Sequence, residues 1–240
     1  MTPPIAPRGC FVTGTDTEVG KTRISAALLH WCVSQGWRSI GFKPVAAGLE
    51  QVSGRWINAD VQALRQASSA VPLTDAEVGP YQFRAACAPH IAAALESRAI
   101  DFEVLLRAAR QLAPQSDALV VEGVGGFVVP LTADRDTADL AQALGLPVVL
   151  VVGLRLGCIN HALLTAESVR ARGLQLAGWV GNTVDPAMPW VDDNIVTLRQ
   201  LLMKRHGAVD LGRVPRLPNP SPQAILSHLD PAGLRQVFDR

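Results

Sequence analysis

The sequence lacks the features that mark a secreted chain, a membrane-spanning chain or a nucleic-acid-binding protein. Residues 1–8 hold three prolines and no apolar core, so we expect no secretory signal there. The longest apolar run, residues 146–153, has the length of a strand and is too short to span a bilayer. The 22 basic and 21 acidic residues leave a formal net charge of +1 with no basic run. We therefore expect neither a nucleic-acid partner nor a membrane partner.

Cysteine and aromatic residues are also sparse. The four cysteines form no C-x-x-C motif, and together with the missing signal this predicts reduced thiols in a cytoplasmic protein. Aromatic residues make up 5% of the chain and are scattered, which favours packing roles over a base-stacking surface. No nucleophilic triad stands out, and His90 and His161 lack the spacing of metal ligands.

The rest of the composition is that of one globular domain. Hydrophobic residues make up 48% and charged residues 18% of the 240 residues, which excludes a disordered chain and allows a sizeable core. We predict a single domain over residues 1–240, with residues 1–8 as a flexible tail.

Apolar, strand-length segments alternate with helical ones along the chain. The predicted strands cover residues 9–14, 39–44, 117–122, 148–152, 175–182 and 209–214. Predicted helices cover residues 21–35, 58–66, 91–97, 101–112, 137–144, 159–172 and 189–206, and a helical tail from residue 223 is broken at Pro231. Residues 46–56 are expected to form a loop, and residues 71–89 to be irregular. This alternation predicts an α/β fold: a mostly parallel sheet with helices on both faces, and ligands at the carboxyl ends of its strands.

Residues 10–22, C-F-V-T-G-T-D-T-E-V-G-K-T, organise the chain. An apolar strand, a glycine-bounded loop and a helix start follow in the order that a phosphate-binding loop requires. The common pattern needs glycine at position 15, but Thr15 stands there and Gly14 comes one residue earlier, so this loop is one residue longer. Lys21 is placed to reach the β- and γ-phosphates, and Thr22 to bind Mg²⁺. The alternative is a chance Gly-Lys-Thr at an ordinary helix start.

Four further polar residues fall at or near predicted strand ends. Glu122 and Asp60 are candidate Mg²⁺ ligands, because Mg²⁺ takes one or two carboxylates beside phosphate oxygens. Lys43 offers a compact positive charge, and Asn182 offers a donor and an acceptor to an adenine edge. Each has a plainer alternative: a strand-end charge, a helix-start carboxylate, a solvated edge lysine and a turn asparagine, respectively.

Residues 153–161, G-L-R-L-G-C-I-N-H, form a second strand–loop–helix junction. Its exposed N–H groups could hold a carboxylate. A plain helix start is the alternative.

Six segments carry a family resemblance: residues 11–22 (F-V-T-G-T-D-T-E-V-G-K-T), 41–48 (G-F-K-P-V-A-A-G), 89–91 (P-H-I), 121–126 (V-E-G-V-G-G), 151–165 (V-V-G-L-R-L-G-C-I-N-H-A-L-L-T) and 176–182 (L-A-G-W-V-G-N). In this order, over about residues 10–186, the chain resembles the dethiobiotin synthetases, ATP-dependent carboxylases of biotin synthesis. The resemblance implies a homodimer with a P-loop NTPase-type sheet of about seven strands. It also implies conversion of 7,8-diaminopelargonate, CO₂ and MgATP to dethiobiotin, ADP and phosphate, through a carbamate and a carbamic-phosphoric anhydride.

The resemblance also implies roles for single residues. Lys21 and Thr17 would hold the γ-phosphate, and Lys43 would hold both the carbamate and the γ-phosphate. Mg²⁺ would lie among Thr22, Asp60 and Glu122. The implied nucleotide contacts are Glu18, Val19, Gly20, Lys21, Thr22, Asp60, Glu122, Gly123, Val124, Gly125, Asn182, Thr183, Val214, Pro215 and Arg216. The implied substrate contacts are Lys43, Ala47, Gly157, Cys158 and Asn160, with the helix start at 157–160 supplied by the other subunit.

The sequence departs from the family at three places. Ala47 stands where the family usually has Ser or Thr, which removes a hydrogen bond to substrate of about 1 kcal/mol net. Val124 replaces a smaller residue, and residues 214–216 match the family's adenine-side segment only loosely. These departures concern the choice of nucleotide, ATP against CTP or GTP, and not phosphate binding.

Two other functions are considered. A related P-loop amidotransferase or synthase would need a glutaminase site, and no such motif is present. A partition or targeting ATPase acting as a nucleotide switch commonly carries a second lysine in the phosphate loop. Residues 15–19, T-D-T-E-V, hold none.

Overall fold

The computed structural model describes residue 6 and residues 8–239. The predicted flexible tail, residues 1–8, therefore falls mainly outside the described residues. Of its two described members, Ala6 is buried in the core, and the Arg8 guanidinium lies 4.7 Å from the centre of the Trp37 ring. Among the described residues, no helix is both long enough and apolar enough to cross a bilayer.

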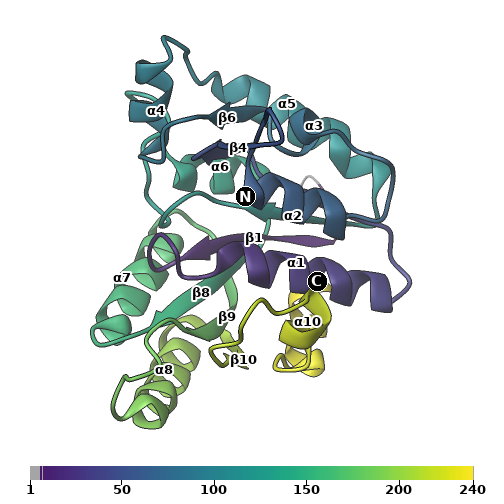
Figure 1. The fold of residues 1–240 in the computed structure, drawn as a ribbon. Helices are drawn as coiled ribbons and strands as arrows, with labels where there is room; N and C mark the ends of the chain where they lie inside the picture. Colours follow the sequence, from purple (N-terminus) through teal and green to yellow (C-terminus); the bar gives the residue numbers. More distant parts are fainter. Residues whose placement is uncertain (1–5, 7, 240) are drawn as a thin grey trace.

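A six-stranded parallel sheet forms the centre of the molecule (Figure 1). Its strands are β1 (Gly9–Gly14), β2 (Ser39–Phe42), β7 (Ala118–Glu122), β8 (Val148–Leu154), β9 (Leu176–Thr183) and β10 (Val209–Val214), in the order β10-β9-β8-β1-β7-β2. The predicted α/β class and parallel sheet are confirmed. Among the described residues the sheet has six strands, whereas the family resemblance implied about seven.

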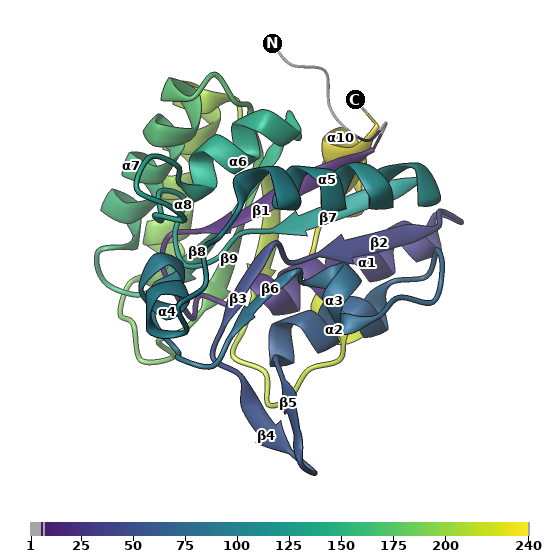
Figure 2. The ribbon, with the colours of Figure 1, turned by 90° about the horizontal axis from the view of Figure 1, so that it is seen from above.

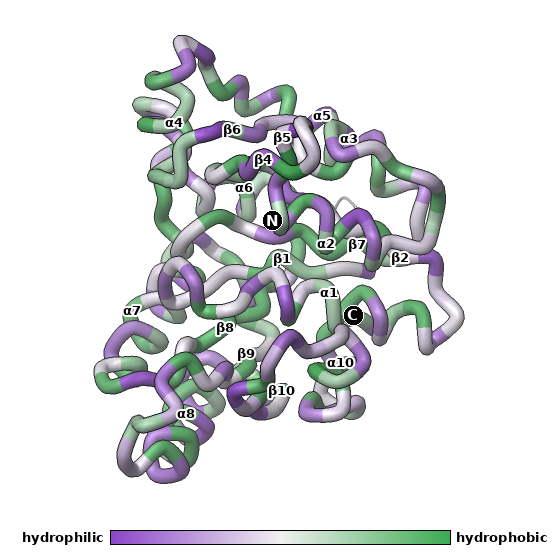
Figure 3. The backbone as a smooth tube through the Cα atoms, viewed as in Figure 1, coloured by the Kyte–Doolittle hydropathy of each residue, from purple (hydrophilic) through white to green (hydrophobic). Residues whose placement is uncertain are grey.

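The inner strands are buried along their whole length because both of their faces are covered. All residues of β1, β7 and β8 are buried, as a parallel sheet between two helical layers requires. Figure 3 shows β8 and β9 as hydrophobic segments inside the molecule, whereas α8 (Val191–His206) carries hydrophilic stretches on the outside.

Helices cover both faces of the sheet, as Figure 2 shows from above. One face is covered by α1 (Lys21–Ser34), α2 (Ala59–Ala67), α9 (Pro222–Leu226) and α10 (Pro231–Phe238). The other is covered by α5 (Phe102–Leu112), α6 (Thr137–Leu144), α7 (Cys158–Ala171) and α8. Pro231 is the first residue of α10, where proline's missing N–H costs nothing, and the predicted break in the tail is confirmed there.

Two predicted irregular segments contain short strands. Residues 46–56 include the end of β3 (Val45–Ala47), all of β4 (Glu50–Val52) and the start of β5 (Arg55–Ile57). Strands β4 and β5 form an antiparallel hairpin, and Ser53 and Gly54, both at positive φ, make its two-residue turn. Residues 71–89 include α3 (Asp75–Val78) and β6 (Tyr81–Phe83), which pairs in parallel with β3. Three-residue strands are too short for an alternating pattern to reveal them.

Helix α4 (Pro89–Leu95) starts two residues earlier than predicted, because Pro89 is its first residue. The helix packs on β3 and β6. Together these elements form a small layer beside the carboxyl edge of the main sheet, next to the loops that follow β1 and β7 (Figure 2).

Candidate active site

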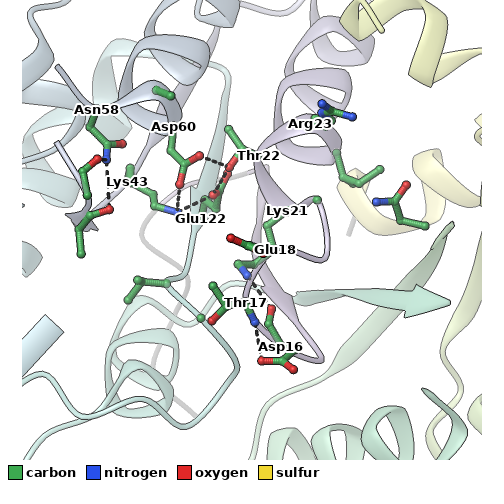
Figure 4. A pocket seen from close by; sticks show the side chains of 18 of the residues that line it. Asp16, Thr17, Glu18, Lys21, Thr22, Arg23, Lys43, Asn58, Asp60 and Glu122 are labelled. Carbon is green, nitrogen blue, oxygen red and sulfur yellow. Dashed lines mark hydrogen bonds and ion pairs between the residues drawn. The ribbon is translucent and has the colours of Figure 1, made fainter. Parts of the chain in front are cut away.

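A cavity of 1190 Å³ opens at the carboxyl edge of the sheet. Its wall is made by the loop after β1, the first turn of α1 and the start of α2. The ends of β7, β9 and β10, the segments that follow β2, β3, β7, β9 and β10, Arg84 and residues 86–89 complete it. This is where an open parallel sheet places its ligands. Figure 4 shows the polar side chains that gather there.

The loop between β1 and α1 has the backbone shape of an anion-binding loop. Glu18 and Gly20 both have positive φ, 59° and 92°, so the chain winds tightly before the helix begins. A Cβ at position 20 would collide with the side-chain amide of Asn182, so only glycine fits there. No side chain caps α1 at Gly20, which leaves the first N–H groups of the helix for an anion.

Lys21 is buried at the bottom of this loop. Its ammonium donates a hydrogen bond to the Asp16 backbone carbonyl at 2.9 Å. Burial, followed by repulsion from Lys43, lowers the pKa of Lys21 to about 8 despite the nearby carboxylates. A triphosphate would supply the charge-assisted hydrogen bonds that this desolvated ammonium lacks.

Lys43 follows β2 and meets two carboxylates inside the protein. Its Nζ lies 2.5 Å from Glu122 Oε1 and 3.0 Å from Asp60 Oδ2, and it donates to the Gly123 carbonyl at 3.1 Å. Burial by itself lowers the pKa of Lys43, but the Glu122 and Asp60 carboxylates outweigh burial and raise the pKa above its ordinary value. Lys43 is therefore a charged ammonium in the interior of the protein.

Thr22 joins the same two carboxylates from the start of α1. Its Oγ1 lies 2.7 Å from Asp60 Oδ1 and 2.7 Å from Glu122 Oε1, although a hydroxyl has one proton to donate. Burial raises the pKa of Asp60, but Lys43 and the Thr22 hydroxyl outweigh burial and leave that pKa below its ordinary value. Figure 4 shows these side chains converging.

The oxygen atoms of this cluster fit Mg²⁺. Glu122 is fully buried, and its Oε2 has no hydrogen-bond partner among the described residues. A hydroxyl and two carboxylates form a hard-oxygen donor set, and Mg²⁺ normally completes its shell with water and phosphate oxygens. The described residues contain no group of three or more His, Cys, Asp or Glu suited to holding a metal.

The far end of the cavity is formed by the segments after β9 and β10. Asn182 donates its amide N–H to the Val19 carbonyl at 2.8 Å, which leaves its side-chain oxygen as an acceptor. Arg216 donates to the Val184 carbonyl at 3.2 Å. Val214, Pro215 and Leu217 line this end beside those polar groups, and such a mixture of apolar and polar groups suits a nucleobase.

Most of the residues singled out from the sequence come together here. Those that line the cavity are Thr17, Glu18, Gly20, Lys21, Thr22, Lys43, Ala47, Asp60, Glu122, Val124, Gly125, Asn182, Thr183, Val214, Pro215 and Arg216. Val19 and Gly123 are not among the lining residues, and each accepts a hydrogen bond through its carbonyl instead. Gly157, Cys158 and Asn160 lie at the start of α7 and do not line the cavity.

Sequence reasoning missed part of the wall. Asn58 caps α2 by accepting from the Val61 N–H. Its amide also donates to the carbonyls of Ala47 at 3.4 Å and Gly48 at 3.2 Å, and so holds the segment after β3 against the cavity. Arg84 and Cys87 line the cavity from residues 84–89, and no motif marked them.

Comparison with known proteins identifies the family. A model described as an AAA domain (AAA_26) matches residues 8–224. The chain belongs to this AAA domain family. It is a P-loop ATPase by family, and Lys21 and Thr22 line its cavity at the carboxyl edge of the sheet.

Solved structures share the fold of this AAA-domain protein. The MinC:MinD cell division protein complex of Aquifex aeolicus matches at 14% identity over 95% of each chain, with a TM-score of 0.52. MinD of the same organism matches at 14% identity over 95% of this chain and 96% of that one, with a TM-score of 0.51. The septum site-determining protein MinD of Pyrococcus horikoshii OT3, complexed with Mg-ADP, matches at 14% identity over 95% and 89%, with a TM-score of 0.51.

Proposed function

We propose that this protein is a dethiobiotin synthase, which uses MgATP and CO₂ to close a ureido ring on 7,8-diaminopelargonate. The observation that carries the proposal is the buried Lys43 ammonium beside Asp60 and Glu122, in the same cavity as Lys21. Phosphate binding alone needs Lys21 and the loop. A second ammonium beyond the phosphates favours a reaction that joins another anion to the γ-phosphate.

The residues of the cavity suit that chemistry. A substrate amine takes up CO₂ to give a carbamate, which is an anion that must approach the anionic γ-phosphate. Lys21 and Lys43 offset this repulsion, and Thr17 at the cavity wall offers a hydroxyl to the γ-phosphate. The carbamate oxygen then attacks phosphorus, ADP leaves, and the second amine closes the ring as phosphate departs.

Mg²⁺ fits this scheme through the oxygens of Thr22, Asp60 and Glu122. When bound, it would neutralise charge on the β- and γ-phosphates. The MinD structure from Pyrococcus horikoshii was determined with Mg-ADP, which supports the same pairing of metal and nucleotide here. We propose ATP as the nucleotide, with the Asn182 oxygen accepting from the amino group of adenine.

The part of the cavity near Ala47 is proposed to hold the diamine. Ala47, Cys87 and Pro89 line the same cavity as Lys43, and we propose that the elongated substrate lies along them. Ala47 offers no hydroxyl, so backbone groups or water would replace that contact. We propose that the Ala47→Ser variant is no less active than wild type.

The substrate's carboxylate is proposed to bind across a homodimer. Gly157, Cys158 and Asn160 lie at the start of α7, where no side chain caps the helix. Leu156 beside them is 86% exposed and Leu164 on the same helix is 58% exposed, as a surface covered by a second subunit would be. We propose a cytoplasmic homodimer that needs neither nucleic acid nor a membrane.

A nucleotide switch is the second candidate, favoured by the shared fold with MinD. The loop interior offers no lysine for such a role, and a switch gives no reason for burying Lys43 with two carboxylates.

Phosphate release distinguishes the two candidates. The purified protein is incubated with MgATP and bicarbonate, with and without 7,8-diaminopelargonate, and the product is examined by mass spectrometry. Diamine-dependent release with dethiobiotin as product is the expected result. If the protein binds MgATP but the diamine causes no additional phosphate release, the synthase activity is excluded.

A further inference from the structure

Asp16 connects the phosphate loop to a cation from another part of the chain. Its backbone carbonyl accepts from Lys21 at 2.9 Å, and its Oδ1 accepts from the Thr17 N–H at 2.7 Å. Its Oδ2 accepts from Arg155 Nη2 at 2.5 Å. Figure 4 shows Asp16 beside Thr17 and Lys21 in the cavity wall. One residue therefore touches two groups assigned to the γ-phosphate.

Arg155 belongs to the turn between β8 and α7, and uncharged groups also join the loop to β8 itself. The Thr15 N–H donates to the Val151 carbonyl at 3.0 Å, and the Gly153 N–H donates to Thr15 Oγ1 at 3.2 Å. These two bonds already fix the position of the loop on β8. Because these bonds already hold the loop on β8, the main contribution of the Asp16–Arg155 ion pair is to neutralise the Asp16 carboxylate.

That compensation has a reason in the charge of the ligand. A triphosphate brings three to four negative charges into the loop, and Asp16 lines the same cavity. An unpaired carboxylate beside it would repel the phosphates, since like charges a few ångströms apart interact appreciably even near the surface. The ion pair is partly exposed, with Arg155 at 42% and Asp16 at 48%, so its effect is expected to be moderate and sensitive to salt.

We propose that Arg155 is a positioning residue for nucleotide binding, which neutralises the Asp16 carboxylate and holds it at the β8–α7 turn while the loop receives the triphosphate. Among the described residues, Arg155 is the only cation that contacts the Asp16 carboxylate. In addition to the Thr17 N–H and Arg155, His161 in the first turn of α7 interacts electrostatically with this carboxylate and lowers its pKa. The inference rests on the nucleotide-binding part of the proposed function and not on its substrate.

The test is a double-mutant cycle on the full-length chain. Calorimetric titration with Mg²⁺ and a non-hydrolysable ATP analogue gives the affinity of wild type, Arg155→Ala, Asp16→Asn and Asp16→Asn/Arg155→Ala. We expect Arg155→Ala to weaken binding about five- to tenfold at low salt, and Asp16→Asn to change it about twofold or less. The double variant should return to within about twofold of wild type, because the repelling carboxylate is then absent.

Salt and two further variants sharpen the cycle. The defect of Arg155→Ala should shrink as ionic strength rises from about 0.05 to about 0.5 M, because exposed charges are screened. Arg155→Lys keeps the charge and should bind within about threefold of wild type. Arg38→Ala removes an exposed arginine–aspartate pair of similar exposure elsewhere, and should leave analogue binding unchanged. Melting curves confirm that each variant is folded.

Three results would overturn the inference: an unchanged affinity in Arg155→Ala, a defect in Asp16→Asn as large as in Arg155→Ala, or a double variant no better than Arg155→Ala. The latter two would indicate a mechanical tether instead. A wild-type protein that binds the analogue but makes no dethiobiotin would contradict the proposed reaction while leaving this inference intact.

Discussion

Strands β2 and β7 are joined by an ion pair at each end, and the two pairs differ in their exposure to solvent. Arg38 and Asp117 meet just before the strands begin, and Lys43 and Glu122 meet where they end. Both pairs join residues 79 positions apart in the sequence. The first lies in solvent at the amino edge, whereas the second is buried at the carboxyl edge.

In the exposed pair, Arg38 donates hydrogen bonds to both oxygens of the Asp117 carboxylate. The Asp117 carboxylate accepts from Arg38 Nε and Nη2, each at 3.1 Å, and from the Arg38 backbone N–H at 2.9 Å. The Asp117 backbone N–H in turn donates to the Arg38 carbonyl. In the buried pair, by contrast, Glu122 Oε2 has no partner among the described residues. A carboxylate oxygen left unpaired in the interior is costly, which indicates that the carboxyl-edge pair is arranged for a ligand rather than for stability.

Removing the lysine of the buried pair should have the largest effect. We expect Lys43→Ala, like Lys21→Ala, to lower the rate of the diamine-dependent reaction by at least about 10²-fold, the loss seen for one preorganised donor. Lys43→Ala should also lower the free energy of unfolding by about 3–5 kcal/mol, because Glu122 then lies buried without its partner. Initial rates and denaturant unfolding measure both effects. Near-normal turnover in a folded Lys43→Ala protein would refute the site.

Neutralising the carboxylate of each pair, Glu122 in one variant and Asp117 in another, should affect the Mg²⁺ dependence of activity only at Glu122. Glu122→Gln keeps the shape but loses the charge, so we expect the Mg²⁺ concentration for half-maximal activity to rise by about tenfold or more. The matched Asp117→Asn variant should show the wild-type Mg²⁺ dependence, because its pair lies at the other end of the sheet. Equal Mg²⁺ curves for Glu122→Gln and wild type would remove Glu122 from the metal site.

The same contrast shows what the sequence could predict. A charged residue that ends or follows an apolar strand of a parallel sheet must lie at the carboxyl edge, so the sequence alone places Lys43 and Glu122 at the same edge. The strands of the main sheet were also predictable, most clearly β7 and β8, whose apolar residues are nearly continuous. The alternation of a three-residue strand is too brief to detect, so β3 to β6 were missed. The pairing of Asp16 with Arg155, 139 positions apart, depends on the register of β8 against β1, which no local pattern specifies.

The smallest effect is expected from Arg38→Ala. Exposed ion pairs contribute little to stability, and salt screens them further, so the unfolding midpoint should move slightly at low salt and coincide with wild type at high salt. Activity and Mg²⁺ dependence should be those of wild type, because Arg38 and the cavity lie at opposite ends of β2. Parallel melts and rate assays at two salt concentrations check this. A loss of activity in Arg38→Ala as large as in Lys43→Ala would mean that the register of β2 on β7, rather than the charge of Lys43, limits the reaction.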